Sequence, residues 1–433
     1  MQRLSNPQAV NARSQFKDFW FVLIVIGTAI PIVGPGSVTG LLGIFVLLLG
    51  AILGLALKIP MLRNLWTVAI VWSTGQALSN IAHGQYYVTF LIYAGITIAL
   101  LASGLYWIHE TVQLSATSIA IAFGIGWVLL KISTGVLSSV NPWKYGLSIP
   151  VAIIVISFAY HRNASRNFTA LLFVGLAITS RYFDNRFQTA LFVLAAIAVL
   201  SITSDRSRQQ RRVKGTLLAL AAAGAVIYVA YPSAADEGLL GERAMIQQQR
   251  DDQNDANFLL SIRKELPMTL YLAAQNPVLG IGSYSKITSS ESAEAIGFVE
   301  SFTGPIDTSE RVYITGGLGD RAGYKAHSEA ASGLLYAGVL AAPFWIWLLV
   351  QIGKALLTIV RGRAIMPGLM FYMTGLVTWD LLFSPLDGNT HLIVGFFLFI
   401  VAASLKKANA VEGDKSQSSP ISPRPGYPSV SGP

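Results

Sequence analysis

The chain has 433 residues, of which 53% are hydrophobic and only 12% are charged, with a net charge of +9. Because a soluble domain usually carries about 25% charged residues, this chain has too few charges to cover a water-exposed globular surface. Its apolar residues form continuous blocks of roughly 17–22 residues, the length needed to cross a hydrocarbon core about 30 Å thick. The blocks do not alternate as barrel strands do, so the sequence predicts an all-α membrane protein.

We expect about twelve transmembrane helices and a large extracytoplasmic loop between helices 9 and 10. The predicted spans are 19–33, 38–57, 62–79, 86–107, 112–130, 145–160, 168–180, 187–203, 213–232, 329–352, 364–384 and 388–405. No small-residue cleavage site follows the first apolar stretch, which we interpret as a retained helix rather than a signal peptide. The predicted division is a tail (1–18), helices 1–9 (19–232), the loop (233–328), helices 10–12 (329–405) and a disordered tail (406–433).

Lysine and arginine are distributed unevenly between the predicted loops, and this bias sets the orientation. Placing Met1 in the cytoplasm also puts inside the strongest basic cluster, which runs from Arg206 to Lys214. The expected location is the inner (plasma) membrane, with both termini cytoplasmic and the loop outside. Since basic residues concentrate in the cytoplasmic loops, the net charge needs no nucleic-acid partner to explain it. The chain has no Cys, so the outer loop must hold its shape by packing on the membrane helices.

His327 is the first candidate functional residue, because it lies where the outer loop re-enters the membrane at the tenth span. Imidazole titrates near neutral pH and can accept a proton from a hydroxyl group. The alternative is a structural role, in which His327 caps the helix N-terminus beside Glu329.

Arg263 is the second candidate. Four apolar residues around it recur at helical spacing: Phe258, Ile262, Leu266 and Leu270. This spacing predicts an amphipathic helix lying on the membrane surface, bent or restarted at Pro267. The residues NPVLGIG over 276–282 then predict a tight turn. Arg263 either binds an anion or belongs to the solvated face of that helix.

The third candidate is the short outer loop SRYFDNRFQ, which holds Arg181, Asp184 and Arg186. Guanidinium suits phosphate because its planar fork donates paired, charge-assisted hydrogen bonds. The alternative is that the arginines snorkel to the membrane interface, with Asp184 as their internal partner. No histidine has a partner at metal-ligand spacing, so no metal site is predicted.

These features together resemble the bacterial O-antigen ligase and O-antigen polymerase superfamily, whose members are polytopic glycosyltransferases that use lipid-linked glycan. The resemblance covers most of the chain in architecture and three short motifs. One family motif is a His followed by Asn, with a Gly eleven positions after the His and a small residue three later. Here His327 is followed by Ser328 instead of Asn, and Gly338 and Ala341 take the later positions.

The other two motifs involve arginine. The family carries an Arg about fifteen residues before a Pro-Leu-x-Gly-x-Gly stretch, which here is Arg263 before the residues 277–282. It also carries Ser-Arg at the start of a span after a short outer loop. Ser180-Arg181 matches the dipeptide, whereas Arg186 matches the position just before the apolar run, so Arg186 is favoured and Arg181 is the alternative.

The resemblance implies a GT-C-like membrane fold, a donor of glycan on undecaprenyl pyrophosphate, a glycan or lipid acceptor, and no metal ion or other cofactor. It implies that Arg263 and Arg186, or Arg181, bind the donor pyrophosphate and that His327 is catalytic. The chain would then be a metal-independent, inverting glycosyltransferase of cell-envelope polysaccharide or lipopolysaccharide assembly. Ligase and polymerase share this chemistry and are not separated by the sequence.

A twelve-helix secondary transporter is the alternative from a different class. Many such transporters consist of two related halves of six spans. The large loop after the ninth predicted span breaks that symmetry.

Overall fold

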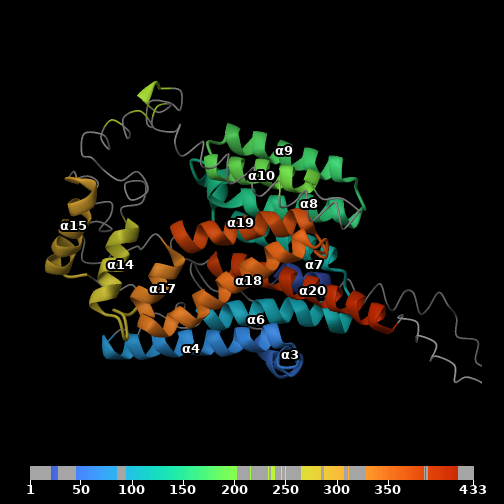
Figure 1. Cartoon of the computed structure of the whole chain (residues 1–433), viewed down its shortest axis with the longest axis horizontal. Coiled ribbons are helices and arrows are strands. Elements are labelled where there is room, and N and C mark those ends of the chain that lie inside the picture. The colour runs from blue at the N-terminus through green and yellow to red at the C-terminus, as the bar shows by residue number, and fades with distance from the viewer. Residues whose placement is uncertain are drawn as a thin grey trace, which may run out of the picture.

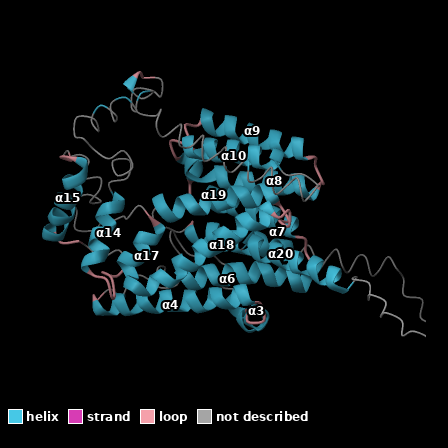
Figure 2. Ribbon diagram, in the orientation of Figure 1, coloured by secondary structure: helices cyan, strands magenta, loops and turns pink. Residues whose placement is uncertain are grey.

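The computed structural model describes residues 21–27, 45–84, 94–201, 265–283, 287–306, 328–384, 386 and 389–417, with the single residues or short pieces 215, 233, 236–238, 245, 249 and 311. Within these residues the chain forms helices joined by turns and contains no β-strand (Figure 2). The predicted all-α class is therefore confirmed for the described part of the chain.

The longer helices lie side by side along one direction, with their turns at the two ends of the bundle (Figure 1). The α-helices are α3 (Leu49–Ala56), α4 (Pro60–Ala82), α6 (Ala94–Trp107), α7 (Ala116–Ser133), α8 (Ser148–His161), α9 (Arg166–Tyr182), α10 (Arg186–Ser201), α14 (Glu265–Gln275), α15 (Ser289–Thr303), α17 (Glu329–Ala337), α18 (Ala342–Val360), α19 (Pro367–Phe383) and α20 (Thr390–Gln417). Short π or 3-10 turns are η1 (Ile108–Val112), η2 (Val136–Ser138), η3 (Trp143–Leu147) and η4 (Gly338–Ala341). The helices α14 and α15 lie at one end of the bundle, at the left of Figure 1.

Three stretches of described helix are long and apolar enough to cross a bilayer: Ala116–Ser133, Trp143–His161 and Glu329–Val360. They overlap the predicted spans 112–130, 145–160 and 329–352. Helices α3 and α4 also meet the criterion together, as a pair bent by 119°. Shorter apolar helices are α10 and the Thr390–Lys406 part of α20. The described helices are thus compatible with a membrane protein.

Local sequence rules explain where several helices begin. Pro60 and Pro367 are the first residues of α4 and α19, where a missing backbone N–H costs nothing. The hydroxyl oxygens of Ser115 and Ser165 accept hydrogen bonds from backbone N–H groups in the first turns of α7 and α9, at 3.0 and 3.2 Å. These caps satisfy donors that a helix start would otherwise leave unpaired.

Several turns that were predicted to be cytoplasmic can be placed relative to the bundle. The α3–α4, α8–α9 and α18–α19 turns lie at one end, and the α9–α10 turn lies at the other (Figure 1). The first three turns and their flanking positions hold Lys58, Arg63, Arg162, Arg166, Arg361 and Arg363. The described loops that were predicted to be cytoplasmic therefore share one end of the bundle.

Helix α14 buries one face against neighbouring helices. Leu270, on the apolar face predicted to lie on the membrane surface, is 46% exposed, whereas Met268 and Leu272 are 0% and 3% exposed. The reason is tertiary, because α14 packs against α17 and α15. Tyr271 of α14 lies 4.7 Å from Phe298 of α15, ring centroid to ring centroid. Contact with neighbouring helices decides which side of α14 is buried, and the membrane-surface position of Leu270 stays a prediction.

Candidate functional site

The four predicted site residues divide into two pairs. Arg263 and His327 lie outside the described residues, so their roles stay predictions. Arg181 and Arg186 are described and lie on either side of the α9–α10 turn. Both side chains are exposed.

The α9–α10 turn is built by hydrogen bonds from its own residues. Asp184 adopts a left-handed backbone with φ 47°, and the backbone N–H of Asn185 donates to the carbonyl oxygen of Ser180 at 2.8 Å. The Asn185 side-chain oxygen accepts from the backbone N–H of Gln188 at 3.4 Å, which caps α10. This geometry makes Arg186 the first residue of α10 and turns it toward the end of the bundle.

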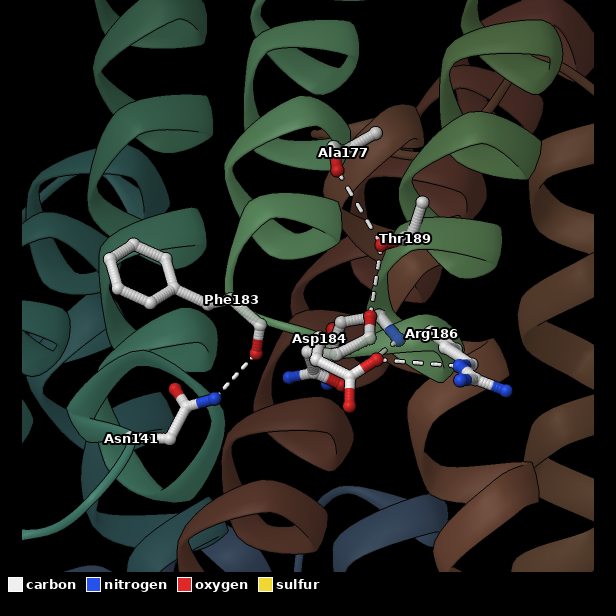
Figure 3. Close-up of polar contacts among 8 residues, drawn as sticks. Asn141, Ala177, Phe183, Asp184, Arg186 and Thr189 are labelled. Carbon is white, nitrogen blue, oxygen red and sulfur yellow. Dashed lines mark hydrogen bonds and ion pairs between the residues drawn. The ribbon is translucent and has the colours of Figure 1, made fainter. Parts of the chain in front are cut away.

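Arg186 forms an ion pair with Asp184, as Figure 3 shows. The Arg186 Nε atom donates to Asp184 Oδ1 at 3.3 Å, and the two side chains are 59% and 56% exposed. This is the internal partner expected if the arginines only snorkel. However, an exposed pair contributes at most about 1 kcal/mol, so it holds the guanidinium only weakly. An anionic ligand can therefore compete for Arg186.

The turn is also fastened to the neighbouring helices. The Asn141 side-chain amide donates to the Phe183 carbonyl oxygen at 2.5 Å (Figure 3). The Trp143 indole N–H donates to the Ser180 hydroxyl oxygen at 2.8 Å, and Ser180 is fully buried. In the Ser180-Arg181 dipeptide, the serine is therefore a packing residue, and only Arg181 is available to a ligand.

Aromatic side chains surround this turn. Phe187 stacks on Trp379 of α19 with 4.2 Å between ring centroids, and Tyr182 is 84% exposed. Tyr145, in η3, is 62% exposed, and the Lys144 ammonium lies 5.9 Å from its ring centroid. Amphipathic aromatic residues concentrate at membrane–water interfaces. The rings around the turn are thus of the type that lies at that boundary, a feature that the sequence analysis did not use.

The predicted turn over 276–282 is present, and it packs directly on the break between α17 and η4. The Ile281 backbone N–H donates to the Leu335 carbonyl oxygen at 2.8 Å, and the Val339 N–H donates to the Pro277 carbonyl oxygen at 2.8 Å. Two glycines allow the backbones to approach this closely. A Cβ atom on Gly280 would lie 2.4 Å from the Leu335 oxygen, and one on Gly338 would lie 2.2 Å from the Val278 oxygen.

We call this contact between residues 276–282 and 335–339 the glycine crossing. It links the end of α14 to the end of α17, and the two helices pack against each other along their length (Figure 1). Gly280 and Gly338 belong to two different motifs of the resemblance. The crossing explains why both positions hold glycine, because neither position has room for a side chain.

Replacing Gly338 with alanine should destabilise the protein by about 2–5 kcal/mol. Gly338 has φ +62° and ψ −153°, a conformation that is essentially restricted to glycine and costs about 1–3 kcal/mol for other residues, and the new methyl group would overlap the Val278 oxygen. The measurement is the thermal unfolding midpoint in detergent. Gly353→Ala in α18 is the matched control, because a Cβ atom there meets nothing within 4 Å. An unchanged midpoint for Gly338→Ala would contradict the crossing.

A cluster of buried polar side chains surrounds the start of α17. Ser328 donates to the Leu381 carbonyl oxygen of α19 at 2.7 Å and caps α17 by accepting from the Ala331 N–H at 3.1 Å. Glu329 is only 2% exposed, and its carboxylate accepts the Thr390 hydroxyl proton at 2.5 Å. These bonds connect Ser328, which directly follows His327, to α19, and they connect Glu329 to α20.

A further polar contact lies at the start of α20. The Lys131 ammonium of α7 donates to the Asn389 side-chain oxygen at 2.6 Å. Sequence reasoning did not connect Lys131, Glu329 and Thr390. The signal that finds such residues is an ionisable side chain within or at the end of an apolar span.

The described residues contain no group of three or more His, Asp or Glu side chains that could hold a metal ion. No protein-family model, characterised protein or solved structure matches this chain. The inference of function therefore depends on the sequence motifs and on the geometry described above.

Proposed function

We propose that this chain is a polytopic membrane glycosyltransferase of the O-antigen ligase or polymerase type, with a GT-C-like fold. It transfers glycan from undecaprenyl pyrophosphate to an acceptor hydroxyl in cell-envelope polysaccharide assembly. The observation that carries the proposal is the glycine crossing, because it joins the two helices that directly follow Arg263 and His327.

The crossing bears on these two residues through chain connectivity. Helices α14 and α17 meet at their C-terminal ends and lie alongside each other (Figure 1). Arg263 precedes Glu265, the first residue of α14, by two positions in the sequence, and His327 directly precedes Ser328, which caps α17. Motifs 64 residues apart in the sequence are thereby tied to one pair of packed helices.

The described arginines fit the same proposal. Arg186 and Arg181 are exposed at the end of the bundle where α14 and α17 lie, and aromatic rings of membrane-interface type surround them. The charged pyrophosphate of a lipid-linked donor lies at the membrane–water interface, just outside the hydrocarbon core. Exposed apolar side chains on α9, Leu171 and Ile178 among them, offer a surface for its lipid chain.

The proposed reaction balances without a metal ion. The acceptor oxygen attacks the anomeric carbon from the face opposite the pyrophosphate. The bond from that carbon to the phosphate oxygen breaks, and its electron pair leaves with undecaprenyl pyrophosphate, so the configuration inverts. His327 orients the acceptor or takes its proton and later releases that proton to water. Arg263 and Arg186, or Arg181, stabilise the charge that grows on the leaving group.

The topology that we propose has about twelve spans, both termini in the cytoplasm and the segment 233–328 outside. Because the chain has no Cys, single cysteines can report on it. Ser289→Cys should react with a membrane-impermeant thiol reagent in intact cells, and Lys415→Cys should react only after lysis. Labelling of the Lys415 position but not the Ser289 position in intact cells would overturn this topology.

The test of function is transfer by the purified chain in liposomes that contain undecaprenyl-pyrophosphate-linked glycan. We expect glycan on a new acceptor and an equal amount of released undecaprenyl pyrophosphate. Lengthened lipid-linked glycan would identify a polymerase, and glycan on a non-repeat acceptor such as a lipid A core would identify a ligase. Movement of a solute across the liposome with no new glycosidic bond would support the transporter instead.

A further inference from the structure

The buried face of α4 changes from apolar to polar along the helix. Near its start, Leu62, Leu65 and Ala69 are fully buried. Near its end, the same face carries Gln76, Ser79 and Asn80, each at most 1% exposed. This second half lies toward the end of the bundle that carries α14 (Figure 1). Burying side-chain amides among apolar neighbours costs free energy unless the amides form hydrogen bonds.

Two of these side chains hold the loop that follows the glycine crossing. The Gln76 side-chain amide donates to the Ser283 hydroxyl at 2.6 Å. The Ser283 backbone N–H donates to the Asn80 side-chain oxygen at 2.7 Å. Ser283 itself is only 1% exposed. Each amide therefore has one hydrogen bond to Ser283: the Gln76 amide through its NH₂ group and the Asn80 amide through its oxygen.

The rest of this polar face is unsatisfied. Among the buried polar atoms of the described residues that have no hydrogen-bond partner, five belong to α4 and one to α18: Trp72 Nε1, Ser73 Oγ, Gln76 Oε1, Ser79 Oγ, Asn80 Nδ2 and Trp345 Nε1. Buried polar groups in folded proteins are almost always paired, by protein or by a bound molecule. One serine would alone satisfy both amides only in part, so Ser283 does not explain the whole face.

The chemistry of the face indicates what it binds. It presents donors and acceptors together, and its unpaired atoms belong to amide, hydroxyl and indole groups, none of which carries a charge. The Trp72 ring lies 5.0 Å from the Trp345 ring and 4.7 Å from the Phe344 ring, centroid to centroid, so a cluster of aromatic rings borders the polar atoms. This combination suits a neutral group that carries hydroxyls. It does not suit pyrophosphate, which needs cations.

We propose that the polar face of α4 is a subsite for the hydroxyl groups of a neutral sugar in the glycan substrate, and that Ser283 fills it when no glycan is bound. This inference rests on the proposed function. The subsite borders the C-terminal end of α17, about 13 Å along a nine-residue helix from Ser328. It would therefore bind a sugar unit distant from the reacting one. Ordered water shares the same hydrogen-bonding chemistry and is the other possible occupant, which the experiment distinguishes.

The test uses two substitutions that should change KM for the glycan substrate in opposite directions. Gln76→Met keeps the side-chain length but removes the amide, and it should raise KM for the glycan substrate about tenfold or more with little change in kcat. Ser283→Ala removes the competing hydroxyl and should lower KM. Gln351→Met in α18 is the matched control, because Gln351 is also 1% exposed with an unpaired side-chain oxygen, but belongs to a different helix. Its KM should equal that of the wild type.

A wild-type KM in both Gln76→Met and Ser283→Ala would overturn the subsite and leave water as the occupant. A second measurement does not depend on transfer. In the Cys-free chain, Ser283→Cys should be alkylated faster when lipid-linked glycan is added, because the sugar displaces residue 283 from the amides. Undecaprenyl phosphate without glycan should not change the rate. An equal rate with both lipids would reject the subsite, whereas faster alkylation without any transfer would reject only the proposed reaction.

Discussion

Replacing Arg263 with alanine should reduce glycan transfer by about 10²–10³-fold, the loss typical when one preorganised donor to a developing negative charge is removed. The pyrophosphate leaving group carries several negative charges, and the proposal assigns their neutralisation to guanidinium groups. Arg263→Lys should recover only part of the activity, because a lysine cannot donate paired, planar hydrogen bonds. The measurement is the initial rate of transfer in liposomes at saturating acceptor.

Arg361→Ala provides the control for a general loss of positive charge. Arg361 is an exposed cation in the α18–α19 turn, at the opposite end of the bundle, and it lies outside all three motifs. Its removal should leave the rate within about twofold of the wild type, as expected for a surface charge outside the site. Full activity in Arg263→Ala would remove this residue from the donor site.

The choice between Arg186 and Arg181 can be made in the same assay. The exposed ion pair with Asp184 holds Arg186 only weakly, and Arg181 is exposed on the last turn of α9. Arg186→Ala should therefore lose activity as Arg263→Ala does. Full activity in Arg186→Ala would move the role to Arg181, and full activity in both single mutants would remove the turn from the mechanism.

Replacing His327 with alanine is the second substitution with a large expected effect, a loss of roughly 10²-fold or more in the transfer rate if it acts as a general base. The chain should still insert and still bind lipid-linked donor, because the arginines are unchanged. Binding of labelled donor to the purified variant measures this. Lost donor binding together with low membrane levels would indicate structural damage instead.

His327→Gln distinguishes a base from a residue that only positions the acceptor. Glutamine keeps a hydrogen-bonding group but cannot take up a proton at neutral pH. A pyrophosphate departs readily, so a correctly held acceptor needs little help from a base. If the base role holds, the glutamine variant should be nearly as slow as the alanine variant. Near wild-type rates for His327→Gln across pH 6 to 8 would disprove the base role.

Several features of the fold could be read from local sequence. Continuous apolar blocks predicted helices because a chain in lipid must pair its backbone groups within each segment, and every described part of the predicted spans contains helix. The turn at 276–282 follows from its proline and glycines. The short loop before Arg186 was predicted from the interruption of apolar sequence, and Asp184 was recognised as a possible ion-pair partner. Each of these properties depends on neighbours within a few residues.

Other features were decided only by contacts between distant parts of the chain. The apolar spacing around Leu270 did not predict that Met268 and Leu272 are buried, because this burial depends on the packing of α14 against α15 and α17. The pairing of Glu329 with Thr390 joins residues 61 positions apart, and that of Gln76 with Ser283 joins residues 207 apart. Composition and periodicity carry no information about such partners.

The sequence by itself thus determined the helical class and the tight turns, since short-range hydrogen bonding and hydropathy govern them. Only the tertiary structure decided why Gly280 and Gly338 must both be glycine, since their backbones cross with no room for a side chain. It alone showed that the polar half of α4 is buried rather than exposed, because burial depends on which helices pack against that face.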